Sequence, residues 1–313
     1  MKRMGGTLSM RCITALTLGA ALAAPIAPAS ARAQVFALTR DELIEFTAKN
    51  PFDRLPDGRP KIPDAMIERA RELSMEEILT IAAQGYRNQY VDGWQLLQPG
   101  KKLVGRAFTV QFMPARPDLD RLAAARAKAR GMDSLNNQAV IDMLQAGDVV
   151  VVDLFGKKEQ GTFVGDNLFY YIMKATRGAG MVVDGAIRDL EGISTMDMPA
   201  YFRRADPSAI GNVTLSGWNI PVRIGGATVM PGDLVVGDRE GVYFVPPELV
   251  ENMLDRADES RIHDEWTRMK FNEGKYKSSE IYGSPRDPQL KKEYEEYLKK
   301  RLEEIRKKRG VQK

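Results

Sequence analysis

The residue pair Arg188-Asp189 ends the part of this 313-residue chain whose side chains are best suited to chemistry. An arginine can clamp a carboxylate through two parallel hydrogen bonds, and an aspartate is a hard oxygen ligand for Mg²⁺ or Mn²⁺. Taken alone, such a pair is more often a surface turn with a local ion pair. A carboxylate clamp beside a metal ligand, however, suggests a binding site for a 2-oxo acid.

The residues that lead to this pair bring further polar groups to it. Residues 161–189 read as a strand, a glycine turn, a helix, a second strand and a turn that ends in the pair. The first N–H groups of a helix have no partner within it and can receive an anion. Here they belong to Asn167, Leu168 and Phe169, which we predict as substrate-binding residues.

The scarcity of histidine and cysteine excludes several other chemistries. His263 is the single histidine and Cys12 the single cysteine. A His-His zinc site therefore cannot form, and a Ser-His or Cys-His dyad would need a residue near the C-terminus. The sequence contains no P-loop and no dinucleotide-binding fingerprint.

The N-terminus has the three parts of a secretory signal peptide. A basic start is followed by an apolar run from Cys12 to Ala24 and by small-x-small cleavage sites that end at Ala31 and Ala33. The apolar run is shorter than the roughly 20 residues of a membrane span. We predict that residues 1–33 are a signal peptide, that the mature protein is periplasmic, and that it has no membrane partner.

Charge argues against a nucleic-acid partner. Four basic residues before Gln34 account for the whole excess of 46 Lys and Arg over 42 Asp and Glu, so the mature chain is neutral. A neutral chain has no overall attraction for nucleic acid. Ten basic residues follow Gln289, but they alternate with acids around an apolar stripe, which favours the solvated face of a docked helix over a nucleic-acid arm.

The apolar pattern predicts an α/β core between helical ends. Capping boxes at Thr39 and Ser74 begin helices in residues 34–102. Valine-rich runs at 103–112, 148–155, 181–183 and 234–236 predict strands, with helices at 118–130 and 137–146 between them. We assign residues 103–250 to this core domain. We assign residues 251–313 to a C-terminal extension. The pattern predicts one helix that begins at Pro246 and runs into this extension to about Met269, and another from Gln289 to Lys308.

Three segments in order resemble the RraA-like family. They are Gly105–Val110, Asp184–Asp189 and Pro231–Pro246, and the resemblance covers roughly residues 103–250. This family includes divalent-metal 4-hydroxy-4-methyl-2-oxoglutarate/4-carboxy-4-hydroxy-2-oxoadipate aldolases and regulators of ribonuclease E activity. The resemblance implies a β/β/α swivelling-type core that assembles as a homotrimer or homohexamer, with the site between protomers.

The resemblance also implies roles for the site residues. In the aldolases the arginine holds the pyruvyl carboxylate, here Arg188, and the next aspartate binds the metal, here Asp189. A further acidic residue near the helix start helps to hold water on the metal. The family spacing places that role at Asn167, and a one-residue shift places it at Asp166, which would then act as a catalytic residue. Both alternatives stay open here.

The function implied is a class II aldolase that releases pyruvate from a 2-oxo acid with Mg²⁺, Mn²⁺ or another divalent metal. The same chemistry would give an oxaloacetate decarboxylase side activity. The alternative is a catalytically silent oligomeric binding protein of the regulator type. An exported protein would not meet a cytoplasmic ribonuclease, which favours the enzyme.

Overall fold

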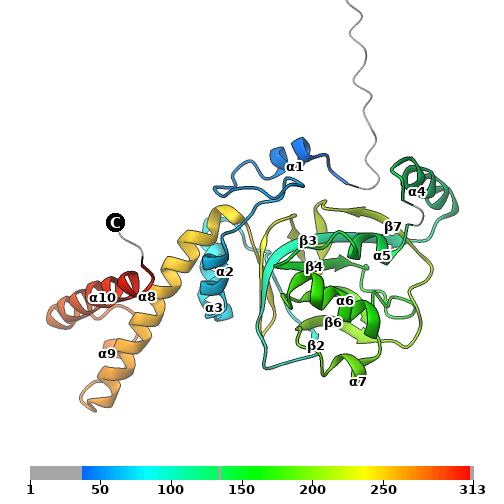
Figure 1. The fold of residues 1–313 in the computed structure, drawn as a ribbon. Helices are drawn as coiled ribbons and strands as arrows, with labels where there is room; N and C mark the ends of the chain where they lie inside the picture. Colours follow the sequence, from blue (N-terminus) through cyan, green and yellow to red (C-terminus); the bar gives the residue numbers. More distant parts are fainter. Residues whose placement is uncertain (1–36, 133–134, 311–313) are drawn as a thin grey trace, which may run out of the picture. The chain divides into compact units, whose positions relative to one another are not determined.

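The computed structural model describes residues 37–132 and 135–310, so the predicted signal peptide lies outside the described residues. Within those two ranges, no helix is long and apolar enough to cross a membrane. Helices and strands alternate through the middle of the chain, and helices predominate at its two ends (Figure 1). The predicted α/β class is confirmed.

A nine-stranded sheet forms the centre of the fold. Its order is β1-β11-β10-β3-β4-β5-β6-β2, and β7 pairs with the outer end of β3. The strands β3 to β6 run parallel, and the remaining pairs are antiparallel. The bounds are β1 (Tyr90–Val91), β2 (Gln95–Leu96), β3 (Leu103–Pro114), β4 (Asp148–Asp153), β5 (Met181–Ile187), β6 (Ala200–Ala205), β7 (Val213–Trp218), β10 (Leu234–Gly237) and β11 (Val242–Val245).

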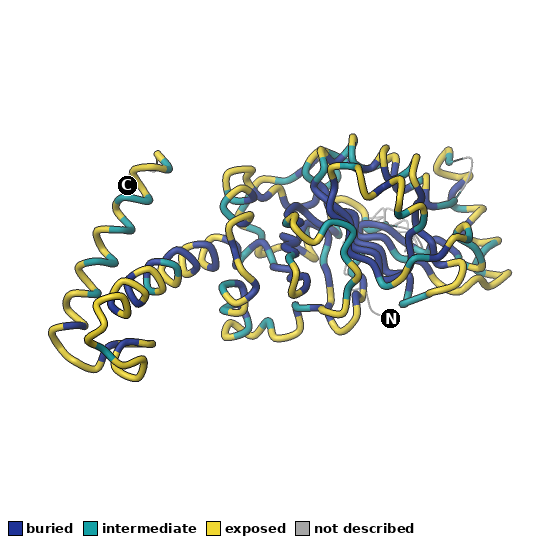
Figure 2. Tube along the Cα trace, turned by 90° about the horizontal axis from the view of Figure 1, so that it is seen from below, coloured by how far each residue is buried: buried dark blue, intermediate teal, exposed yellow. Residues whose placement is uncertain are grey.

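The parallel strands are apolar because both of their faces are covered. Every residue of β4 and of β5 is buried, and these strands form the dark centre of Figure 2. Alternate residues of β4 enter different clusters: Val150 and Val152 face one layer, and Val149 and Val151 face the other. This explains why the valine runs do not alternate with polar residues.

Helices cover one face of the sheet. The β4–β6 half of that face packs against α4, α5, α6 and α7, and the β10–β11 half packs against α2, α3, η1 and the start of α8. The bounds are α2 (Asp64–Ala70), α3 (Met75–Ile78), the 3₁₀ helix η1 (Leu79–Gln84), α4 (Pro117–Ala129), α5 (Asn137–Ile141), α6 (Asp166–Thr176), α7 (Leu190–Ile193) and α8 (Pro247–Asn272).

The other face is covered by a two-stranded sheet, β8 (Val222–Ile224) and β9 (Ala227–Val229). The turn Pro231–Asp233 leads from this small sheet into β10. The turn at Gly237-Asp238 does join two paired strands, β10 and β11. Asp238 supports that turn by accepting the N–H of Glu240 at 2.8 Å.

The N-terminal segment contributes strands as well as helices. Its first helix, α1 (Arg40–Phe46), has the predicted capping box at Thr39, and α3 has the one predicted at Ser74. The same segment also supplies β1 and β2 to the large sheet. The described part of this segment, residues 37–102, thus contributes strands to the sheet as well as helices packed against it.

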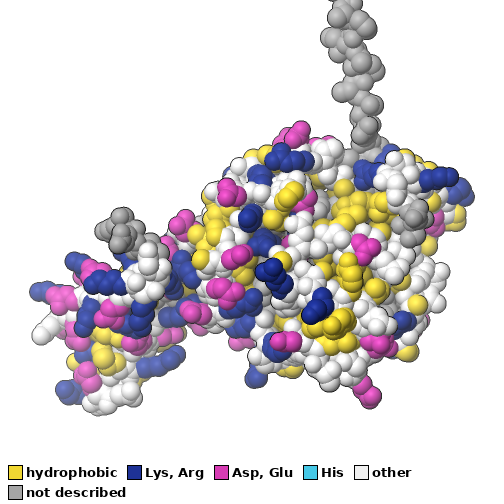
Figure 3. Space-filling model, in the orientation of Figure 1, with side chains coloured by type: hydrophobic (Ala, Val, Ile, Leu, Met, Phe, Trp, Pro, Cys, Tyr) yellow, Lys and Arg dark blue, Asp and Glu magenta, His cyan; other side chains and the backbone are white. Residues whose placement is uncertain are grey.

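The C-terminal extension consists of the long α8, the short α9 (Ser278–Ile281) and α10 (Pro288–Lys308). Trp266, Ile281 and Leu290 form a small core of their own, against which Tyr294 and Tyr297 pack. Basic and acidic side chains alternate on the face of this extension seen in Figure 3. That mixture is typical of a solvated helix face.

Candidate active site

Arg188 and Asp189 lie at the carboxyl end of β5, beside the segment that leads into α6. Phe163 donates its N–H to Ala186 O at 2.9 Å, and Arg188 donates its N–H to Val164 O at 3.1 Å. The strand predicted near residue 161 is reduced to one isolated bridge, between Thr162 and Ala186, because the chain turns into α6 three residues later. These backbone bonds nevertheless fix the pair against Gly165, which precedes α6.

Asp189 directs its carboxylate at the first N–H group of α6. Its oxygen Oδ2 accepts the N–H of Asp166 at 3.2 Å and lies 3.3 Å from Nε of Arg188. The helix dipole and the guanidinium both favour a negative charge at this point. Asp189 has φ +60°, a left-handed conformation that is costly for a side chain other than glycine and is often found at functional sites.

Gly165 makes this close approach possible. A Cβ atom at residue 165 would lie 2.2 Å from Oδ2 of Asp189 and 2.7 Å from Nε of Arg188. From the sequence, this glycine is only part of a turn. Glycine is required at this position because of a contact across the site, and the spacing of residues along the chain does not reveal that contact.

The first N–H groups of α6 have other partners than the substrate anion that the sequence predicts for them. The N–H of Asn167 is bound by Oδ1 of Asp166 at 2.6 Å, and the N–H of Phe169 donates to Gly165 O at 2.9 Å. Phe169 itself is buried, whereas Asp166 and Asn167 are exposed. Two of the three expected anion donors are therefore engaged within the helix, and the anion bound at the helix start is Asp189.

Leu168 is half-buried and lines a cavity of about 590 Å³ between α5 and α6, together with Asn136, Gln138, Met143 and Tyr171. This cavity has both apolar and amide-bearing walls, and Leu168 is the one predicted site residue that lines it. Arg188 and Asp189 have side-chain exposures of 37% and 41%, so both can be reached by a small molecule.

The two carboxylates suit a cation that keeps much of its water. Among residues 37–132 and 135–310, no group of three or more His, Cys, Asp or Glu side chains could together hold a metal. Mg²⁺ is usually bound through one or two carboxylates and several waters. Asp189 and Asp166 are both exposed, and the backbone N–H of Asp166 donates to the Asp189 carboxylate. This donor set fits Mg²⁺ or Mn²⁺ and does not fit a fully protein-enclosed metal.

A second pair of acidic residues lies on the opposite face of the sheet. Asp153 of β4 and Asp184 of β5 are direct neighbours in the parallel register. Asp184 accepts Nε of Arg203 at 2.7 Å, and Arg203 stacks on Trp94 at 3.7 Å from the ring centre. Burial raises the pKa of Asp153, and the charge of Asp184 adds to that rise. The position of each aspartate after a valine run was a usable signal, but the sequence analysis gave these residues no role.

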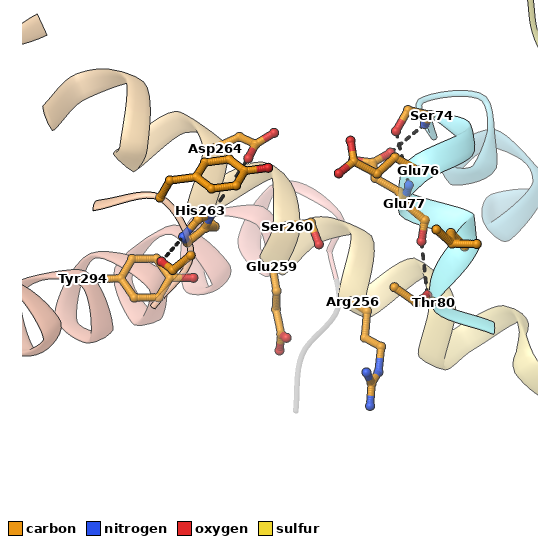
Figure 4. Close-up of a pocket in the computed structure, with 13 residues that line it drawn as sticks. Ser74, Glu76, Glu77, Thr80, Arg256, Glu259, Ser260, His263, Asp264 and Tyr294 are labelled. Carbon is orange, nitrogen blue, oxygen red and sulfur yellow. Dashed lines mark hydrogen bonds and ion pairs between the residues drawn. The ribbon is translucent and has the colours of Figure 1, made fainter. Parts of the chain in front are cut away.

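A cavity of about 680 Å³ lies elsewhere, between α3 and the C-terminal extension (Figure 4). Nε2 of His263 donates to Gly283 O at 2.8 Å, and the His263 ring packs edge-on against Tyr294. Glu76 and Glu77 line the α3 side, and Glu259 lines the α8 side. None of the predicted site residues lines this cavity, so it is separate from the site at Arg188 and Asp189.

Comparisons with known proteins agree with this fold. The family model described as "RraA-like: Aldolase/RraA" matches residues 61–244. A protein of Halalkalibacterium halodurans, named "Putative 4-hydroxy-4-methyl-2-oxoglutarate aldolase", is 38% identical over 170 residues, which are 54% of this chain and 71% of that protein. The chain belongs to the RraA-like family.

Solved structures show the same fold. The Streptomyces coelicolor protein RraAS2, described as an unusual member of the RNase ES inhibitor RraA protein family, is 29% identical with a TM-score of 0.57. The match covers 67% of this chain and 100% of that one. An uncharacterized Pseudomonas syringae protein is 24% identical with the same TM-score of 0.57, over 72% of this chain and 94% of that one. The predicted RraA-like core is confirmed.

Proposed function

We propose that this protein is a divalent-metal-dependent class II aldolase that cleaves a 2-oxo acid and releases pyruvate. The observation that supports this most is the position of Arg188 and Asp189. A guanidinium and a carboxylate meet at the exposed start of α6, where one can bind a substrate carboxylate and the other a cation. The aldolase name of the 38% identical relative points to the same reaction.

The chain's residues divide the work by their chemistry. Arg188 binds the carboxylate of the pyruvyl unit, because its fork of N–H donors matches two carboxylate oxygens. Asp189 holds the metal, with Asp166 beside it. A divalent cation at this position supplies Lewis-acid polarisation of the 2-oxo group. Leu168 and its neighbours along the α5–α6 cavity contact the rest of the substrate.

Asp166 is the general base. It takes the proton of the substrate hydroxyl, whose carbon becomes the carbonyl of the released product as the C–C bond breaks. The electron pair of that bond passes to the pyruvyl fragment, which then takes up a proton at carbon to become pyruvate. Asp166 is exposed and next to the pair, as a general base must be. Oxaloacetate would lose CO₂ by the same redistribution of electrons.

Pyruvate release tests this proposal. The protein is stripped of metal and assayed on a panel of 2-oxo acids, including 4-hydroxy-4-methyl-2-oxoglutarate and oxaloacetate, with and without Mg²⁺ or Mn²⁺. We expect turnover only with metal. Arg188→Ala should lower turnover by roughly two to three orders of magnitude while metal still binds, because a charge-assisted hydrogen bond to substrate is lost. Asp189→Ala should abolish metal binding.

Lys174→Ala is the matched control, because it removes an exposed cation from the same helix. It should leave turnover and metal binding unchanged. A wild-type protein that neither binds a divalent cation nor turns over any member of the panel would contradict the aldolase. That result would favour the second candidate, a binding protein, which the description of the Streptomyces relative as a member of an inhibitor family supports.

We also propose that the protein is exported and assembles as a homotrimer or homohexamer. The basic, apolar and small-x-small order of residues 1–33 supports export. Mass spectrometry of the native protein should give an N-terminus at Arg32 or Gln34, and a chain that retains Met1 would contradict it. Light scattering should show three or six copies, and a monomer with full activity would contradict a shared site.

A further inference from the structure

A cavity of about 380 Å³ lies where the segment after α1 passes over the start of β10 and of α8. None of its lining residues belongs to the segment 161–189. Its walls are mainly apolar, formed by Phe46, Ala48, Met230, Pro246 and Pro247. A concave, mostly apolar space with a few converging polar groups is the usual form of a small-molecule site.

Asp233 is the most deeply placed polar group of this cavity, with 1% exposure. Its Oδ2 accepts the N–H of Met230 at 2.8 Å, which closes the turn into β10. A carboxylate can accept about four hydrogen bonds, so one N–H leaves most of that capacity unused. Burial raises the pKa of Asp233 to about 7, with the Met230 N–H acting in the opposite direction.

Tyr86 and Glu248 complete the polar end. The Tyr86 hydroxyl donates to Oε1 of Glu248. That hydrogen bond, followed by burial and by the charges of Glu248 and Asp233, raises the pKa of Tyr86 to about 12. The proton of Tyr86 is thus committed to Glu248, and its oxygen remains an acceptor.

The titratable groups around Asp233 come from three parts of the chain. Tyr86 lies between η1 and β1, Glu248 is in α8, and Glu45 and Lys49 lie in and just after α1. Lys49 has an Nζ atom 3.6 Å from Oε2 of Glu248, but its side chain is 79% exposed, so it lies at the rim. The inner groups are therefore acceptors, and they favour a ligand that donates hydrogen bonds and carries positive charge.

We propose that this cavity binds a small organic ammonium ion. Its NH₃⁺ group donates to Asp233 and to the Tyr86 oxygen, and its short apolar body packs against Phe46, Met230 and Pro247. A carboxylate of the same size would meet Asp233 and Glu248 and be repelled. This site is independent of the aldolase reaction, because it shares no residue with Arg188, Asp189 or Asp166.

Calorimetry on the whole protein tests the site with three probes of one size: butylammonium, 1-butanol and butyrate. We expect butylammonium to bind at least tenfold more tightly than the other two. We also expect its affinity to rise about tenfold from pH 6 to pH 8, because only the ionised form of Asp233 accepts the ammonium group. At pH 6, buffers of different ionisation enthalpy should report proton release on binding.

Two variants test whether Asp233 accounts for the affinity for butylammonium and for its pH dependence. Asp233→Asn keeps an oxygen for the Met230 N–H but removes the charge, and it should lose at least tenfold in affinity together with the pH dependence. Glu45→Gln, an exposed acid at the rim, is the matched control and should change affinity less than threefold. Should Asp233→Asn fail to fold, Tyr86→Phe and the three-probe comparison on the wild-type chain still decide.

The proposal is overturned if butylammonium at 10 mM shows no binding, on the scale of the weakest specific complexes. It is equally overturned if the alcohol or the carboxylate binds as tightly, or if Asp233→Asn retains the affinity. Each of these outcomes leaves the aldolase assay unaffected, so the two proposals fail separately.

Discussion

Gly165 controls how closely α6 approaches the Arg188-Asp189 pair. Its backbone has φ −118°, which any residue can adopt, so the need for glycine is purely one of space. The Cβ of any other residue would overlap Oδ2 of Asp189. The close approach of α6 to the Arg188-Asp189 pair therefore depends on the lack of a Cβ atom at residue 165.

Gly165→Ala should therefore impair catalysis far more than folding. Displacing Asp189 and Arg188 by about an ångström should lower kcat/KM by roughly 100-fold. The free energy of unfolding, measured with urea, should change by less than about 1 kcal/mol, because the pair is exposed and can shift. Gly192→Ala is the control, since a Cβ there meets nothing within 4 Å. Equal activities of the two variants would contradict the role given to Gly165.

Asp166 and Asn167 are the two candidates at the start of α6 for the residue that helps to hold water on the metal. Only a carboxylate can take the proton of the substrate hydroxyl. Asp166→Asn should therefore lower kcat more than Asn167→Ala, although the amide can still accept the N–H of Asn167. Steady-state kinetics at saturating Mg²⁺ decides. The reverse order would contradict Asp166 as the general base and would assign the holding of metal-bound water to Asn167.

The segment Pro56–Pro60 is the least predictable element of the fold. From the sequence it is an irregular connection rich in proline and glycine. In the structure Arg59 is fully buried and binds both carboxylate oxygens of Asp148, at 2.9 and 3.0 Å, while its Nε binds Asp57 at 2.7 Å. Burial alone would lower the pKa of Arg59, but Asp148 and Asp57 outweigh it and raise the pKa. The segment is thus clamped to the first residue of β4.

Arg59→Ala should destabilise the protein strongly. Asp148 is itself fully buried, and it would lose the partner that compensates its charge. Breaking a buried ion pair in this way typically costs about 3–5 kcal/mol. Urea unfolding at pH 7 measures the loss. Arg87→Ala, at an exposed position, should cost less than about 0.5 kcal/mol, and a similar small cost for Arg59→Ala would rule out the clamp.

Local signals explain what could be predicted at the level of elements. The capping boxes at Thr39 and Ser74, and the valine runs of β4 and β5, act over a few residues, so the sequence reveals them. The Arg59–Asp148 pair joins residues 89 apart, and the contact of Gly165 with Asp189 crosses α6 and β5. Contacts of that range depend on the assembled fold. The residue types single out Arg188 and Asp189 and the family resemblance implies their roles, but neither predicts the hydrogen bonds that they make.

Asp258 connects the C-terminal extension to the rest of the molecule. This 7%-exposed carboxylate contacts Arg69 of α2 at 2.9 Å, Arg261 of α8 at 3.7 Å, and Arg309 just after α10. Burial alone would raise the pKa of Asp258, but the hydrogen bond and charge of Arg309, with Arg69, outweigh it and lower the pKa. One acid thus unites elements from both ends of the described chain.

Asp258→Asn should lower the free energy of unfolding by about 1–3 kcal/mol at pH 7, since its partners can still be solvated. A lowered pKa stabilises the fold above the unfolded value of about 3.9, and that contribution is lost as the pH falls through the folded pKa. The difference between wild type and variant should therefore shrink below about pH 4. Asp255→Asn, which is 65% exposed, is the control. A difference that stays constant with pH would contradict the role of Asp258.

The central position of β3 determines how much of the chain must be present before the sheet can be completed. β3 is complete at Pro114, but its partners are β4 at 148–153, β7 at 213–218 and β10 at 234–237. More than a hundred residues must leave the ribosome before its last edge is paired. Until then a 12-residue apolar strand exposes open hydrogen-bonding edges, which promote aggregation. A chain that ends before residue 237 would leave the β10 edge of β3 unpaired, and we expect it to aggregate more readily than the full chain.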